Sequence, residues 1–127
     1  MNFEQDYIMR CIHEMVRFIL KMLFNIDDIN QCEEKTQMKM REHSKLMSMA
    51  SEGKINEAEN YLYDCIDSND KNWLIIGIRF YNLLNEFDDI FLEKHDYSRQ
   101  EVHDGLIRLL SSYGHESLLS VLTQLAM

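Results

Sequence analysis

The backbone of this chain contains almost none of the residues that interrupt regular secondary structure. Its 127 residues include no proline and only four glycines. A β-sheet domain needs turn residues about every ten positions, whereas long helices joined by short loops need few. We therefore predict an all-α fold, with about six helices in a helical array or bundle. Because the length is that of one ordinary domain, residues 1–127 are expected to form a single helical domain.

The six expected helices follow from hydrophobic residues at helical spacing and from residues that favour helix ends. Asp70 is placed to cap one helix, and Ser98 opens a capping box ahead of another. Gly53 and Gly114 stand where a helix is expected to end. The segment 71–94 is the most apolar, which predicts that it is the central core helix. The expected ranges are about 3–24, 29–51, 56–67, 71–94, 99–113 and 118–125.

The charge balance restricts the partners of the chain. Its formal net charge is −9, with 22 acidic and 13 basic residues. An acidic surface repels phosphate backbones, so we expect no general binding of nucleic acid, and we expect no docking of the whole surface on an anionic membrane. No stretch reaches the roughly 20 apolar residues that a membrane-spanning helix needs.

Cysteine usage and the first residues indicate a compartment. Cys11, Cys32 and Cys65 form no Cys-x-x-Cys pair and are odd in number, which favours reduced thiols over a disulfide framework. Residues 2–6 are partly acidic and begin no apolar block, so they do not resemble a secretory signal. These features predict a cytoplasmic protein.

Two acidic couples form the one pattern that suggests catalysis. Glu86 and Asp89 form a Glu-x-x-Asp couple, and Glu101 and Asp104 form a second one. On neighbouring helices, four such carboxylates could surround Mg²⁺. The pattern is similar to the magnesium site of all-helical nucleoside triphosphate pyrophosphohydrolases, although that family has Glu-x-x-Glu in the first couple and a longer spacer. The competing interpretation is that Glu101 caps a helix and that the other carboxylates lie on a solvated face.

Other arrangements that could carry chemistry are weaker. No histidine has a Cys, His, Asp or Glu three or four residues away, which is the spacing that shares a helix face. The dipeptide His95-Asp96 resembles that of HD-type phosphohydrolases, with His43 and Asp104 as nominal partners, but a surface loop explains it better. We therefore predict no catalytic, cofactor-binding or metal-binding residue and no cofactor.

The segment 3–24 carries the alternative to catalysis. Its apolar arc is wide, and the opposite face is locally basic, with Arg10, Arg17 and Lys21 against Glu14. Such a helix suits a core, a partner helix or a membrane surface. If it forms a homodimer, the residues expected to anchor the interface are Phe18, Met22 and Phe24.

Two resemblances accompany these patterns. The segment Gly53–Glu59 and the helix it opens resemble the second helix of a tetratricopeptide repeat, in which small residues, here Ala58 and Cys65, admit a neighbouring helix. Asp70 stands where that repeat closes with proline. The residues Asn2–Arg10, with 14–18, look like a family of small uncharacterised proteins from Gram-positive gut-type bacteria. The first resemblance implies tetratricopeptide-like hairpin packing; the second implies a bacterial source and no catalytic residues.

The function that these features favour is a non-enzymatic protein–protein interaction module. Its partner is another protein, and we expect a homodimer formed through the segment 3–24. The alternative is an Mg²⁺-dependent pyrophosphohydrolase-like enzyme that uses the two Glu-x-x-Asp couples.

Overall fold

The computed structural model describes residues 3–29, 39–115 and 117–118. This part of the chain contains six helices and no strand, which confirms the predicted all-α fold. No helix within these ranges is both long enough and apolar enough to span a bilayer. The helices are α1 (Phe3–Phe24), α3 (Met40–Ser51), α4 (Ile55–Cys65), α5 (Lys71–Glu86), α6 (Asp89–Lys94) and α7 (Arg99–Ser112).

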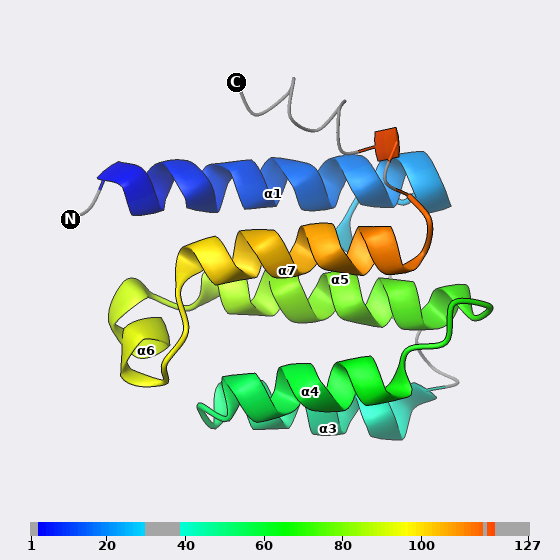
Figure 1. Ribbon diagram of the computed structural model, residues 1–127. Coiled ribbons are helices and arrows are strands. Elements are labelled where there is room, and N and C mark those ends of the chain that lie inside the picture. Colours follow the sequence, from blue (N-terminus) through cyan, green and yellow to red (C-terminus); the bar gives the residue numbers. More distant parts are fainter. Residues whose placement is uncertain (1–2, 30–38, 116, 119–127) are drawn as a thin grey trace.

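The helices are arranged around α5 (Figure 1). One side of α5 packs against α1 and α7, which run in the same direction as each other and opposite to α5. The antiparallel α3–α4 hairpin lies on the other side, where α3 contacts α5. The short helix α6 lies at one end of the molecule, in the connection from α5 to α7. The prediction that the segment beginning at residue 71 is central is confirmed for α5.

The core explains this central position. One cluster of buried hydrophobic side chains includes residues from all six described helices. Every residue from Trp73 to Ile78 in α5 is buried, as expected of a helix covered on all sides. Gly77 permits the close approach of α7, because a Cβ atom there would lie 2.6 Å from a side-chain atom of Leu109.

The ends of the helices follow local chemistry, as the sequence predicts. The Asp70 carboxylate accepts a hydrogen bond from the backbone N–H of Asn72 at the start of α5. The Ser98 hydroxyl accepts one from the N–H of Glu101 at the start of α7. Gly53 and Gly114 follow α3 and α7 with φ of 91° and 75°, the left-handed region that glycine tolerates.

The prediction of one continuous helix over 71–94 is wrong. The helix breaks after Glu86, and the Asp88 carboxylate caps α6 by accepting a hydrogen bond of 2.7 Å from the N–H of Phe91. The buried Arg99 guanidinium donates to the carbonyl oxygens of Asn85 and Phe87 at the break. Because the cap and the guanidinium satisfy backbone groups that a break exposes, the chain can turn here.

The other helix boundaries agree with the predicted ranges to within two residues wherever the structure describes them. The range 3–24 is confirmed by α1, and the second half of the range 29–51 is confirmed by α3. The predicted helix over 56–67 corresponds to α4, which ends two residues earlier, at Cys65. Residues 30–38 of the second expected helix, and residues 119–125 of the sixth, lie outside the described residues.

Candidate functional site

The four carboxylates of the Glu-x-x-Asp couples are not brought together. The Asp89 carboxylate is 2.7 Å from Arg99 Nη2, and the Glu86 carboxylate is 3.4 Å from the amide nitrogen of Asn82. Glu101 Oε1 accepts a hydrogen bond from the Ser98 hydroxyl. The Asp104 carboxylate accepts one of 3.0 Å from Gln100 on its own helix. Within the described residues, no three His, Cys, Asp or Glu side chains converge to hold a metal ion.

The His95-Asp96 dipeptide lies after α6, at the predicted surface position. The His95 Nδ1 atom is 2.8 Å from the carbonyl oxygen of Phe91. The His95 and Phe91 rings pack together at a tilt of 49°, with centroids 4.5 Å apart. A Cβ atom at Gly53 would meet the His95 ring, so the imidazole packs against the α3–α4 turn. The histidine therefore has a packing role in this structure.

Cys11 and Cys65 are not joined in a disulfide.

Helix α1 presents both a core face and an exposed face. Ile12 and Ile19 are fully buried, whereas the side chains of Tyr7 and Met22 are 50% and 59% exposed. Phe18 and Phe24 are half-buried and pack against the core. Of the three side chains expected to anchor a dimer, Met22 is thus the most accessible, and Tyr7 is a further exposed residue that the sequence analysis did not include among them.

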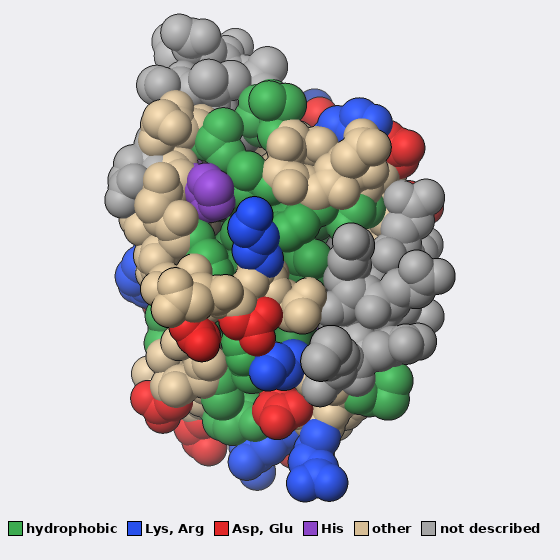
Figure 2. Space-filling view, turned by 90° about the vertical axis from the view of Figure 1, so that its right-hand side faces the viewer, with side chains coloured by type: hydrophobic (Ala, Val, Ile, Leu, Met, Phe, Trp, Pro, Cys, Tyr) green, Lys and Arg blue, Asp and Glu red, His purple; other side chains and the backbone are tan. Residues whose placement is uncertain are grey.

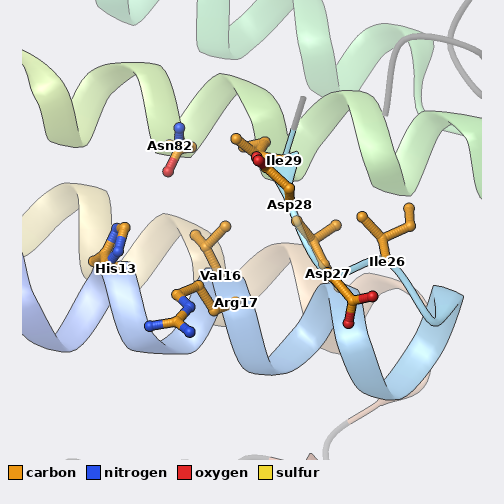
Figure 3. Close-up of a pocket in the computed structure, with 9 residues that line it drawn as sticks. His13, Val16, Arg17, Ile26, Asp27, Asp28, Ile29 and Asn82 are labelled. Carbon is orange, nitrogen blue, oxygen red and sulfur yellow. The ribbon is translucent and has the colours of Figure 1, made fainter. Parts of the chain in front are cut away.

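A hollow of about 210 Å³ lies between α1, α5 and the segment that follows α1 (Figure 3). His13 and Arg17 of α1 line one side, and Asn82 reaches toward it from α5. Asp27 and Asp28 contribute acidic groups. The remaining lining residues are apolar: Val16, Leu20, Ile26 and Ile29. The hollow combines an apolar lining with charges of both signs.

A second, more open hollow of about 430 Å³ adjoins the first along α1. Arg17, Ile26 and Asp27 border both hollows, so together they form one continuous depression. The second hollow extends to the half-buried Phe18. Two ion pairs border it: Lys21 Nζ lies 2.8 Å from the Asp27 carboxylate, and Arg17 lies 3.7 Å from Glu14 on the same helix. We call the two hollows together the α1 depression. The residues that line its second hollow are Glu14, Arg17, Phe18, Lys21, Ile26 and Asp27.

The end of the molecule where α1 and α7 end and α5 begins has a mixed surface (Figure 2). Basic and acidic side chains are interspersed there, and hydrophobic side chains reach the surface between them. Such a surface lacks the continuous positive charge that would attract a phosphate backbone. It therefore gives no support to a nucleic-acid interface on this face.

A polar cluster that the sequence analysis missed joins α4, α5 and α7. Glu59 Oε2 accepts hydrogen bonds from the hydroxyls of Tyr81 at 2.6 Å and Tyr97 at 2.8 Å, and Arg108 Nη2 lies 3.0 Å away. The Tyr63 hydroxyl lies 3.3 Å from that of Tyr81, and the Arg108 guanidinium stacks over the Tyr63 ring at 5.1 Å. We call these five residues the Glu59 cluster.

Burial keeps the hydroxyl groups of Tyr81 and Tyr97 in the Glu59 cluster protonated. Desolvation raises the pKa of Tyr81 and Tyr97 far above the ordinary value, and the nearby Glu59 charge raises both further. Both phenols therefore stay protonated and can donate to the carboxylate. The Glu59 side chain is only 15% exposed, so its charge needs these donors. The five residues are spread from position 59 to position 108, and no local spacing could have revealed them.

Comparison with known proteins places the chain in a family without assigning it an activity. No curated protein and no solved structure matches it. The model of one family matches residues 2–114, which is most of the sequence. The matched region spans every described helix, including the Glu59 cluster and the α1 depression. The chain therefore belongs to the Family of unknown function (DUF6483).

Proposed function

We propose that this protein is a protein–protein interaction module that forms a homodimer through the outer face of α1. The observation that carries the proposal is the pair of exposed hydrophobic side chains, Tyr7 and Met22, on the helix that borders the α1 depression. Large exposed apolar groups next to a hollowed, charge-rimmed surface are typical of interaction sites.

Helical geometry places the apolar side chains on one line. Tyr7, Phe18 and Met22 are separated by eleven and four residues, so they project within about 60° of one another around the helix axis. The line runs along the flank of the core face that Ile12 and Ile19 occupy. A helix of 22 residues is roughly 33 Å long, which is enough to support a paired-helix interface.

A two-fold axis near the middle of α1 would pair this line with itself. In an antiparallel arrangement, Tyr7 of one copy lies opposite Met22 of the other. The same arrangement brings Glu14 of each copy near Arg17 of its partner, so opposite charges meet at the centre. Such a self-complementary, closed contact is the commonest form of homodimer.

Light scattering coupled to gel filtration tests the proposal. The expected result is a dimer at concentrations on the order of 100 µM, a range in which a micromolar interface is occupied. Met22→Asp should shift the mass to that of a monomer, because it places a charge in the apolar line. The matched control is Ile90→Asp, which changes an exposed side chain far from α1 and should remain dimeric. A wild-type protein that stays monomeric at this concentration would overturn the proposal.

The contacts of the four carboxylates do not favour the Mg²⁺-dependent enzyme. Asp89 already pairs with Arg99, and the other three carboxylates hydrogen-bond to residues three or four positions away in the sequence.

The proposal also includes tetratricopeptide-like packing of one hairpin and a cytoplasmic location. The left-handed φ of Gly53 and the buried Ala58 support a tetratricopeptide-like hairpin in α3 and α4. Cys11 and Cys65 are not joined in a disulfide, which supports a cytoplasmic location.

A further inference from the structure

Helix α6 carries an exposed side chain that the fold does not explain. Ile90 is 78% exposed, the highest value among the large exposed hydrophobic residues of the described chain. The same helix anchors itself to the core through Leu92, which is 1% exposed. The packing of α6 therefore does not need Ile90, and leaving it in water gains nothing for the folded state.

Aromatic rings extend the apolar surface around Ile90. Phe87 and Phe91 precede and follow it, are both half-buried, and have ring centroids 4.7 Å apart. The Phe91 ring in turn packs at a tilt against the His95 ring. We call Phe87, Ile90, Phe91 and His95 the α6 patch. A group of this kind differs from the scattered single hydrophobic residues that are normal on protein surfaces.

The rim of the α6 patch is acidic. Exposed carboxylates surround it in the sequence: Glu86, Asp88, Glu93 and Asp96. The exposed basic residue within this stretch is Lys94, while Arg99 is buried and pairs with Asp89. Lys54 of the adjoining α3–α4 turn lies 3.9 Å from Glu52, so it does not reverse this balance. The net local charge is therefore negative, which attracts a positively charged partner and repels an anionic membrane.

The α6 patch is held in place before any partner binds. Asp88 caps the helix, and Arg99 bonds to the carbonyl oxygen of Phe87 at 2.8 Å. The His95 ring nitrogen contacts the carbonyl oxygen of Phe91 at 2.8 Å. A partner would not have to order this surface, so less free energy is lost on binding.

We propose that the α6 patch docks a basic amphipathic helical segment of a different protein, with an apolar side chain of that segment packed on Ile90. The apolar centre and acidic rim complement the two faces of such a helix. A second copy of the chain is a poorer fit, because contact between α6 of one copy and the basic outer face of α1 of another is heterologous and would not close in a dimer. This surface lies apart from the proposed α1 interface, and the inference does not rest on it.

Fluorescence anisotropy with synthetic peptides tests this inference. The probe is a labelled amphipathic peptide of leucine and lysine, compared with a peptide that has glutamate for lysine and with a scrambled peptide of the same composition. The full chain should bind the first peptide more tightly than the other two, and added salt should weaken this binding.

Two variants locate the binding on α6. Ile90→Asp should weaken it about tenfold or more, and Glu93→Lys should weaken it by reversing a rim charge. Met22→Asp is the matched control: it places the same charge on α1 and should bind as the wild type does. Because both substituted hydrophobic residues are exposed, circular dichroism should show folded proteins.

Three outcomes would overturn the inference. The first is equal affinity for the lysine and scrambled peptides, which would show attraction by charge alone. The second is unchanged binding by Ile90→Asp. The third is open-ended self-association of the wild-type protein beyond a dimer that Ile90→Asp abolishes, which would make a second copy the occupant. None of these depends on whether the wild-type protein is a dimer, so the two proposals can fail separately.

Discussion

Glu59 connects segments of the chain that are distant in the sequence. Its carboxylate accepts from Tyr81 of α5, from Tyr97 before α7 and from Arg108 within α7. Gly105 makes room for this arrangement, because a Cβ atom there would lie 2.4 Å from the Tyr81 ring. A nearly buried carboxylate with three donors on one oxygen is costly to disturb, since removal of any donor leaves polar atoms unsatisfied.

Stability at high pH should report the buried tyrosines. Tyrosine in the unfolded chain ionises near pH 10, whereas burial raises the pKa of Tyr81 and Tyr97 in the folded protein. Their contribution is complete below pH 10 and is lost as the pH rises above it, because only the unfolded state then releases the protons. Each such tyrosine should lower the free energy of unfolding by up to about 1.4 kcal/mol per pH unit.

Urea denaturation between pH 8 and pH 11 measures this effect. Tyr97→Phe should make the fall above pH 10 shallower than in the wild type, since one titrating group is gone. The exposed residue Asn60 on α4 provides the control, because Asn60→Ala should leave the slope unchanged. Identical slopes for Tyr97→Phe and the wild type would contradict the assignment.

At the scale of the elements, the break between α5 and α6 is the main departure from the sequence prediction. Apolar residues continue at helical spacing through both helices, so periodicity alone predicts one helix over 71–94. The break becomes favourable because Arg99, which follows in the sequence, reaches back to the carbonyl oxygens of Asn85 and Phe87. A hydrophobic pattern does not contain that contact, although the capping potential of Asp88 was present in the sequence.

Arg99→Met should test the role of this guanidinium. It removes the donors for two carbonyl oxygens and for Asp89, so the free energy of unfolding should fall by about 1–3 kcal/mol. Arg41→Met on α3 is the control, since Arg41 is exposed. The comparison uses urea denaturation followed by circular dichroism. Equal stability of the two variants would show that the break does not depend on Arg99.

At the scale of the whole molecule, the shared core predicts cooperative unfolding. Side chains from all six described helices form one buried cluster, and α5 supplies many of them. Helices that share one core are expected to unfold together, and a chain of this size is in the range of two-state behaviour. The α3–α4 hairpin is included, because Leu46, Ala50 and Leu62 are fully buried.

The single tryptophan makes this measurable. Trp73 lies at the start of α5 and is 5% exposed, so its fluorescence reports local packing while far-UV circular dichroism reports all helices. The two probes should give the same urea midpoint. Separate midpoints would show that part of the chain unfolds independently and would contradict a single cooperative domain.

The sequence by itself determined the helical class and most helix ends. Helical hydrogen bonds join residues four apart, and caps such as Asp70 and Ser98 act within three residues, so local pattern is sufficient. The tertiary structure alone decided that Glu59 gathers two tyrosines and an arginine, that Asp89 pairs with Arg99, and that Ile90 faces solvent. These outcomes depend on contacts between distant segments, which only the packed helices bring together.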